Sequence, residues 1–415
     1  MIDKLIIKVK SGNGGKGSVS FNRDSKNSRG GPDGGNGGNG GKVLLKSNSN
    51  LEDLYRYNFQ KTFSAENGQD GSKQNKSGAK GSDLVLELPI GCLVWELIGN
   101  KRTLVASILD DSQEIELLLG GVGGKGNTSF VSSQNKEPLL AEAGQTTSIK
   151  TLELDFRIFS DLLLLGPPNV GKSTFLSVVT NAKPEIKNYP FTTRKPIVAI
   201  SKINYSNIKI LELPAILDKK SLGMKFLKHI YGTKIICLTI SVNENIEDQI
   251  KKVFDCIKAF DKDLMKRNFL ILLTKSEKLT TTQKEKISKQ ILSKFLEIKV
   301  PPFFFSSSDA KENIDILSYL QKNLKEFNDF TYEGLVPTIS LQATTQKIKK
   351  IKNTYEILDK NFLQLADGSD LSNWKALVQF QYKLKNSKIS KELKELGIQK
   401  GDKLKISSYE FTWEE

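Results

Sequence analysis

The chain has 415 residues, of which 38% are hydrophobic and 26% charged, with a net charge of +15 and a single histidine. This composition is typical of a soluble globular protein of two or three domains, and it excludes multi-histidine metal sites. No apolar run reaches the roughly 20 residues that a membrane span needs, the start of the chain has no apolar run like that of a signal peptide, and the three cysteines are too far apart for a disulfide framework or a thiolate zinc site. We therefore expect a cytoplasmic protein without a membrane span.

The positive charge is uneven. The excess of lysine and arginine is +3 in residues 1–150, +10 in residues 151–328 and +2 in residues 329–415. Such a balance favours polyanionic partners through the field around the protein. It fits a lysine-rich protein with solvated surfaces almost as well, so charge alone leaves contact with nucleic acid open.

Glycine dominates the first third of the chain, because 24 of the 32 glycines fall in residues 1–150. Many recur at every third position, as at Gly31, Gly34, Gly37 and Gly40. A period of three is that of the polyproline II helix, in which glycine lets neighbouring strands pack closely. A flexible linker is the alternative, but strand-like runs at residues 5–9, 42–45 and 84–88 separate the tracts. We favour packed polyproline II helices on a small β scaffold.

A phosphate-binding loop follows. Residues 159–165 are typical of a buried parallel strand, residues 175–179 continue as a helix, and the pattern GxxxxGKS lies between them. The loop is expected to bind a nucleotide through Gly166, Pro167, Pro168, Asn169, Val170, Gly171, Lys172, Ser173 and Thr174. Backbone N–H groups at the helix N-terminus attract phosphates, Lys172 reaches the β- and γ-phosphates, and Ser173 coordinates Mg²⁺, which keeps most of its waters.

Further loops follow predicted strands. Residues 189–193 lie where a first switch supplies a Mg²⁺-binding threonine, Thr193, and strands at 208–211, 269–273 and 303–305 each lead into polar residues. This order predicts a doubly wound sheet with its ligand at the carboxyl ends of the strands, and it favours a GTPase over an ATPase. The predicted nucleotide contacts are Phe191, Thr192, Thr193, Arg194, Lys195, Glu212, Leu213, Pro214, Ala215, Thr274, Lys275, Ser276, Glu277, Ser306, Ser307 and Ser308.

The C-terminal region begins with polar residues 329–350, which form either a solvated linker or a contact to a nucleic-acid backbone through their lysines. A helix is expected after an Asp370 N-cap, with Leu371, Trp374, Leu377 and Val378 on one face. A second helix carries Ile389, Leu393 and Leu396 and stops at Gly397. Alternating residues 404–413 predict a strand, whose aromatic residues fit a core better than a base-stacking platform. His229 is interpreted as an ordinary helix residue.

The chain resembles the Obg family of bacterial GTPases over nearly its whole length. Residues 30–35, 65–68 and 120–124 are close to motifs of the Obg glycine-rich domain, and residues 166–174 are similar to GFPNVGKST. Residues 189–193 match YPFTT, and residues 401–406 and 409–411 resemble the small C-terminal domain of many members. The resemblance implies an Obg glycine-rich domain at 1–158, an α/β P-loop GTPase domain at 159–328, a linker at 329–350 and an α+β domain at 351–415.

The resemblance also implies function. It implies Mg²⁺-dependent binding of GTP and GDP, slow hydrolysis, and a role at the large ribosomal subunit and its rRNA in assembly and in growth or stress control. A monomer is expected. No catalytic residue is assigned beyond transition-state stabilisation by Lys172 and Thr193. In related GTPases an asparagine at the place of Asn169 helps bind K⁺; the alternative role of Asn169 is loop geometry alone.

Two motifs depart from the family. DxPG is replaced by residues 212–215, ELPA, followed by a shortened segment, and Ile216 stands where Ras-like enzymes have a water-orienting glutamine. NKxD is replaced by residues 274–277, TKSE, and the lost asparagine is expected to remove a tie that stiffens the site. Glu277 would read the guanine base from a shifted position. Two alternatives therefore stay open: a degenerate member that binds nucleotide and ribosome with little hydrolysis, and a P-loop ATPase.

Overall fold

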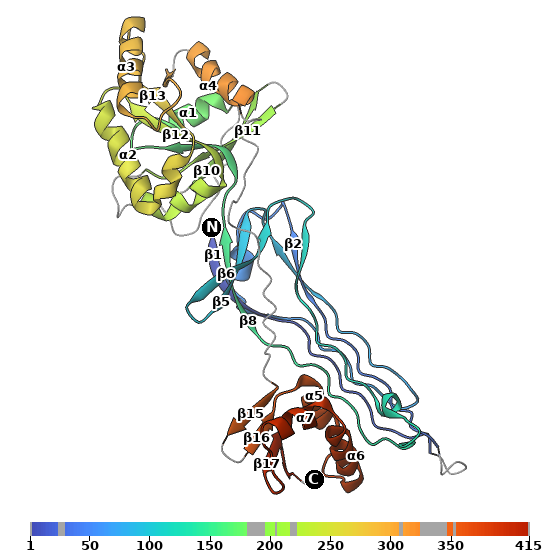
Figure 1. Cartoon of the computed structure of the whole chain (residues 1–415). Coiled ribbons are helices and arrows are strands. Elements are labelled where there is room, and N and C mark those ends of the chain that lie inside the picture. Colours follow the sequence, from blue (N-terminus) through green and yellow to red (C-terminus); the bar gives the residue numbers. More distant parts are fainter. Residues whose placement is uncertain are drawn as a thin grey trace. The chain divides into compact units, whose positions relative to one another are not determined.

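The computed structural model describes residues 2–23, 30–180, 196–203, 206–215, 222–306, 310–323, 347–351 and 354–413. The chain divides into two units (Figure 1). The first consists of Met1–Asp3 and Phe156–Val336, and the second of Lys4–Asp155 and Pro337–Glu415. Each unit has its own sheets and its own buried core.

The glycine-rich part of the second unit is built on two small sheets. One has the order β3 (Thr62–Ser64), β1 (Lys4–Lys10), β8 (Lys150–Phe156), β5 (Cys92–Ile98), β6 (Lys101–Ile108), and the other the order β4 (Leu84–Leu88), β2 (Val43–Ser47), β7 (Glu114–Leu118). Burial alternates along β1, because successive side chains of a strand point to opposite faces and Leu5, Ile7 and Val9 face the core. Short 3₁₀ helices cover Tyr55–Tyr57 and Asn127–Phe130. The three predicted strands are confirmed.

The glycine tracts form long extended arms that lie side by side (Figure 1). Backbone hydrogen bonds link one tract to the next, for example from Gly15 N–H to the Gly38 carbonyl at 2.9 Å and from Gly40 N–H to the Gly121 carbonyl at 2.8 Å. A Cβ atom on Gly37 would lie 2.0 Å from the Gly15 oxygen. This close backbone packing supports the predicted packed helices and is incompatible with a flexible linker.

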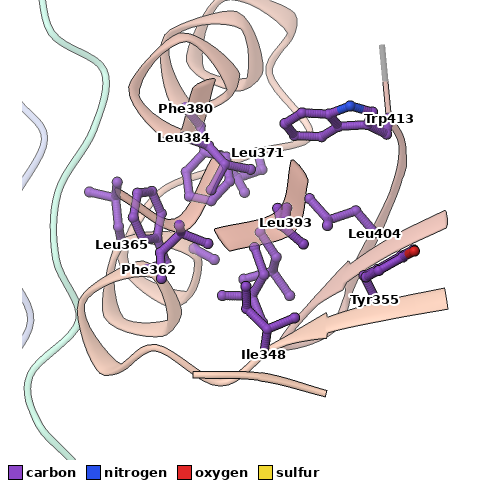
Figure 2. Packing of buried hydrophobic residues seen from close by; sticks show 14 of the residues in the cluster. Ile348, Tyr355, Phe362, Leu365, Leu371, Phe380, Leu384, Leu393, Leu404 and Trp413 are labelled. Carbon is purple, nitrogen blue, oxygen red and sulfur yellow. The ribbon is translucent and has the colours of Figure 1, made fainter. Parts of the chain in front are cut away.

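The C-terminal part of the second unit is an α+β domain. Its sheet has the order β15 (Ile348–Ile351), β16 (Thr354–Ile357), β17 (Lys403–Ile406), β18 (Tyr409–Thr412), and its helices are α5 (Lys360–Gly368), α6 (Trp374–Lys385) and α7 (Lys388–Glu395). Figure 2 shows Tyr355, Phe380 and Leu393 packing in its core. Because β15 begins at Ile348, the last residues of the predicted linker belong to this sheet.

Three sequence predictions for this domain can be compared with the structure. The second helix ends as expected before Gly397, which has a φ of +78°. The predicted Asp370 N-cap is wrong, because Asn373 caps α6 and accepts from Lys375 N–H at 3.0 Å, whereas Asp370 accepts from Ser372 in the preceding turn. The predicted apolar face is also wrong at Trp374 and Val378, which are 72% and 43% exposed, and Leu371 precedes the helix.

A loop of the glycine-rich part closes one side of the C-terminal core. Leu140 is 3% exposed and belongs to the same cluster as the core residues of the C-terminal domain. Next to it, Ala141 N–H donates to the Ser369 hydroxyl at 3.1 Å, and Ala143 N–H donates to the Gln364 carbonyl at 2.7 Å. Residues that lie more than 200 positions apart in the chain are thus joined within the second unit.

The first unit contains a six-stranded sheet, and helices flank it (Figure 1). The strand order is β10 (Ile197–Ile203), β11 (Ser206–Glu212), β9 (Ser160–Leu165), β12 (Thr233–Ser241), β13 (Phe269–Thr274), β14 (Phe303–Phe305). All neighbours are parallel except β10, which runs antiparallel to β11. The helices are α1 (Lys172–Val179), α2 (Ile246–Phe260), α3 (Thr281–Lys294) and α4 (Ala310–Asn323), with 3₁₀ helices at Leu222–Gly232 and Lys262–Lys266. The predicted doubly wound sheet is confirmed.

His229 lies in the 3₁₀ helix Leu222–Gly232 and not in an α-helix. It is 0% exposed, and its Nδ1 accepts from Ile158 N–H at 3.2 Å. Burial, and secondarily the charges of Lys228 and Arg157, lower the pKa of His229 to about 3. The imidazole is therefore a neutral group of the core, which differs from the prediction of an ordinary helix residue.

No helix within the described ranges has the length and apolarity of a membrane span.

Candidate nucleotide-binding site

The site begins with the loop that joins β9 to α1. Asn169 has a φ of +59° and Gly171, the N-cap of α1, a φ of +94°. A Cβ atom on Gly166 would lie 2.2 Å from the Thr239 carbonyl oxygen, so only glycine fits there. These turns aim the loop at the helix N-terminus, where free N–H groups and the helix dipole attract phosphate. The left-handed backbone of Asn169 supports a role in loop geometry.

Lys172 is the buried cation of this loop. It is 6% exposed, and its Nζ donates to the carbonyls of Gly166 at 3.1 Å and Pro167 at 2.8 Å. A charge-assisted hydrogen bond of this kind is roughly twice as strong as a neutral one. The two carbonyls therefore fix the ammonium over the loop.

Ser173 and Glu212 form the acidic side of the site. The Ser173 hydroxyl donates to Glu212 Oε1 at 2.8 Å, and the Glu212 side chain is 7% exposed. The other carboxylate oxygen, Oε2, is buried and has no hydrogen-bond partner in the described part of the chain. Burial raises the pKa of Glu212, while the hydrogen bond from Ser173 and the charge of Lys172 act in the opposite direction. A hydroxyl beside a desolvated carboxylate is an oxygen donor set that fits Mg²⁺.

The loop after β13 lies against the phosphate loop. The Thr274 hydroxyl donates to the Val170 carbonyl and is also 3.1 Å from the Ile240 carbonyl. From the sequence, the loss of the asparagine is expected to remove a stabilising contact between the two loops. That expectation is wrong, because the Thr274 hydroxyl forms a hydrogen bond between them. Lys275 then adopts a φ of +61°, and the Ser276 hydroxyl donates to the Phe305 carbonyl at 2.9 Å. Glu277 is exposed.

The parallel strands bring most predicted residues to one edge of the sheet. These are Gly166 to Thr174, Glu212 to Ala215, Thr274 to Glu277, and Ser306. The other predicted contacts lie outside the described residues, namely Phe191, Thr192, Thr193, Arg194, Lys195, Ser307 and Ser308, and so does Ile216. Within the described ranges, no cluster of three or more histidine, cysteine or acidic side chains forms a metal site.

Sequence reasoning missed Thr239. It lies on β12, its carbonyl faces Gly166, and its buried hydroxyl has no hydrogen-bond partner among the described residues. The signal was a pair of hydroxyl residues, Thr239 and Ser241, that follow the apolar run 235–238 at the end of the strand. Such residues at the carboxyl end of a parallel strand are candidates for the ligand edge.

Comparison with protein families matches the chain in three consecutive blocks. Residues 2–158 match the model described as GTP1/OBG, residues 161–275 that described as 50S ribosome-binding GTPase, and residues 346–413 a domain of unknown function, DUF1967. The three-domain architecture expected from the sequence is thereby shown. The blocks follow the glycine-rich part, the P-loop sheet and the C-terminal α+β domain.

Curated relatives match over the full length. The chain is 32% identical to the GTPase Obg of Finegoldia magna over 427 residues, which covers 100% of both chains. It is 32% identical to the GTPase Obg of Clostridioides difficile, covering 99% of both, and 34% identical to that of Persephonella marina, covering 76% of this chain and 94% of the relative. With its intact phosphate loop and its three matched blocks, the chain belongs to the Obg family of GTPases.

Proposed function

We propose that the protein binds GTP and GDP with Mg²⁺, hydrolyses GTP slowly, and acts in assembly of the large ribosomal subunit and in growth or stress control. The observation that carries the proposal is the edge where Lys172, Ser173 and Thr274 converge. Domain limits at 1–158 and 159–328, a linker from residue 329 that ends before β15, a C-terminal domain that begins with β15, a monomeric state and a cytoplasmic location belong to the same proposal.

The described residues act by positioning charge. N–H groups of the loop and the Lys172 ammonium neutralise the β- and γ-phosphates, and Ser173 supplies an oxygen ligand, with Thr193 as a second in the proposed switch. A Mg²⁺ ion held by Ser173 and Thr193 would supply positive charge where negative charge develops between the β- and γ-phosphates. Because phosphoryl transfer depends mainly on positioning and charge neutralisation, such a site without a water-orienting side chain would be slow. A K⁺ ion beside Asn169 is a further proposed cofactor.

The ribosomal role rests on the glycine-rich arms and on the family description. The arms pack so closely that a Cβ on Gly37 would lie 2.0 Å from the Gly15 oxygen. We therefore expect the arms to be a rigid element that can contact rRNA. We expect cosedimentation with large subunits that weakens steeply as salt rises, because phosphate contacts release counterions. Salt-independent binding, or none, would remove rRNA as the partner.

One experiment tests the nucleotide assignment. Affinities for GTP, GDP and ATP are measured with Mg²⁺ on the full chain, and single-turnover hydrolysis is followed on the same sample. Guanine nucleotides should bind at least tenfold more tightly than ATP, about 1.4 kcal/mol. Tighter binding of ATP than of GTP would indicate that the protein is a P-loop ATPase and that residues 274–277 do not select guanine.

A second candidate is a protein that binds nucleotide and ribosome but barely hydrolyses. It is favoured by Ala215, which stands where the γ-phosphate would meet a backbone N–H, since alanine lacks the conformational freedom of glycine. GTP binding without phosphate release in the single-turnover experiment would select this candidate.

A further inference from the structure

The carboxylate of Glu212 accepts a hydrogen bond from the Ser173 hydroxyl. The two oxygens are 2.8 Å apart, and both belong to residues fixed by regular structure, Glu212 at the end of β11 and Ser173 in the first turn of α1. The strand is parallel to β9, whose end leads into the phosphate loop. The pair is therefore part of the sheet edge and not a chance surface contact.

This spacing matches two neighbouring ligands of one Mg²⁺ ion. Magnesium requires near-octahedral coordination with ligand distances of 2.0–2.1 Å, so that adjacent ligands lie about 3 Å apart. Glu212 Oε1 and Ser173 Oγ already have that separation. An aspartate on the same backbone would withdraw its carboxylate by about one carbon–carbon bond, roughly 1.5 Å, which leaves room for a water between carboxylate and ion.

The surroundings of Glu212 also favour direct contact. Its second oxygen is buried without a hydrogen-bond partner in the described part of the chain, and a buried polar atom left unsatisfied is costly. A bound cation would satisfy it and offset the desolvation of the carboxylate. The charge of Lys172 also acts on Glu212, and the Lys172 ammonium donates to the Gly166 and Pro167 carbonyls.

We propose that Glu212 coordinates Mg²⁺ directly in the nucleotide complex, in place of one of the waters that the ion would otherwise keep. Ser173 exchanges its hydrogen bond to Glu212 for coordination of the same ion. This inference rests on the proposed function and adds a metal ligand to it. Because this ligand comes from the protein, it holds Mg²⁺ with GDP as well as with GTP.

The experiment counts the waters on the ion. The full chain is loaded with GDP and Mn²⁺, and electron paramagnetic resonance in ¹⁷O-enriched water gives the number of bound waters. Glu212→Asp should have one water more than the unchanged protein. Equal counts would overturn the inference, because Glu212 would then act through a water as an aspartate does.

A second experiment measures how the release of GDP depends on the Mg²⁺ concentration, without manganese. The Mg²⁺ concentration that half-maximally slows release of a fluorescent GDP analogue should rise at least tenfold in Glu212→Gln. It should stay unchanged in Glu285→Gln, which removes an exposed carboxylate from α3. An unchanged midpoint in Glu212→Gln overturns the inference. Absence of any GDP binding by the unchanged protein would overturn the proposed function as well, whereas normal binding with equal water counts overturns the direct ligand alone.

Discussion

The hydroxyl of Thr274, at the end of β13, donates to the carbonyl of Val170 in the phosphate loop. Both groups are buried, and Thr274 is 1% exposed. The residue that opens the proposed base-binding loop therefore also positions the backbone that would hold the phosphates. In the proposed nucleotide complex, one side chain would therefore couple base recognition to phosphate recognition.

Thr274→Val tests this coupling, because it keeps the shape of the side chain and removes the hydroxyl. The Val170 carbonyl loses a buried partner, which costs about 1–3 kcal/mol, and we expect GTP and GDP affinity to fall about tenfold. Equilibrium titration with fluorescent nucleotides measures the change. Thr274→Ser, which keeps the donor, is the control and should bind within about threefold of the unchanged protein. Equal affinities for the valine and serine variants would contradict the coupling.

Lys172→Ala tests the phosphate loop itself. The substitution removes the cation that Gly166 and Pro167 hold over the loop. GTP affinity should fall by at least a factor of ten, about 1.4 kcal/mol, as measured by calorimetry. Lys289→Ala removes the same charge from the exposed face of α3 and should have no effect. If the two variants bind GTP equally well, the P-loop assignment is wrong.

The sequence predicted the parts of the molecule that rest on local pattern. Strands β1, β9 and β13 and the turn at Gly171 follow from runs of apolar residues and from one motif, since each is determined by residues close together in the chain. The motif GxxxxGKS has to lie between a strand and a helix, which made the first half of the site predictable. The period of three predicted the glycine arms in the same way.

What the sequence did not predict depends on contacts between distant residues. The threonine tie to Val170 joins positions 104 residues apart, and the return of Ser369 to Ala141 joins positions 228 residues apart. No local pattern carries such pairs. The Asp370 error is of another kind: both Asp370 and Asn373 are good N-caps, and the turn before the helix decides between them.

The glycine arms predict a sharp difference between two alanine substitutions. In Gly37→Ala the new Cβ would lie 2.0 Å from the Gly15 oxygen, whereas a Cβ added to Gly31 would have no atom within 4 Å beyond its chain neighbours. We expect Gly37→Ala to lower the free energy of unfolding by about 2 kcal/mol or more and Gly31→Ala to be nearly neutral. Urea unfolding followed by tryptophan fluorescence measures this, because all three tryptophans, Trp95, Trp374 and Trp413, lie in the second unit. Similar midpoints for the two variants would rule out close packing of the arms.

Ala215 should reduce the difference between GTP and GDP. A switch distinguishes the two nucleotides through contacts made only by the γ-phosphate, and the stiffer alanine backbone weakens one of them. We expect GTP and GDP affinities within about tenfold, or 1.4 kcal/mol, by competition titration. Ala215→Gly combined with Glu212→Asp should raise the GTP preference only in part, because the segment after Ala215 stays short. A hundredfold preference for GTP in the unchanged protein would show that the segment after Ala215 contacts the γ-phosphate in another way.

His229 makes the first unit sensitive to mild acid. The pKa of this histidine is lowered to about 3, chiefly by burial, from an ordinary value of 6.5. Its contribution to stability is therefore complete above pH 6.5. As the pH falls below 6.5 the unfolded chain binds a proton that the folded chain does not, and this contribution is lost progressively down to about pH 3. The slope is about 1.4 kcal/mol per pH unit within that window.

The effect can be isolated because His229 is the only histidine in the chain. Between pH 7 and pH 5.5 the free energy of unfolding of the first unit should drop by about 1 kcal/mol, measured by urea titration with pulsed hydrogen exchange of β9 and β12 at a fixed pulse pH. His229→Asn keeps an acceptor for the Ile158 N–H but does not titrate, so its stability should be flat over the same range. Asp3 lies 3.7 Å from His229 Nε2, but it is also paired with Lys228 at 3.0 Å, and the positive charge of Lys228 disfavours the imidazolium. A pH slope shared by the asparagine variant would assign the sensitivity to carboxylates instead.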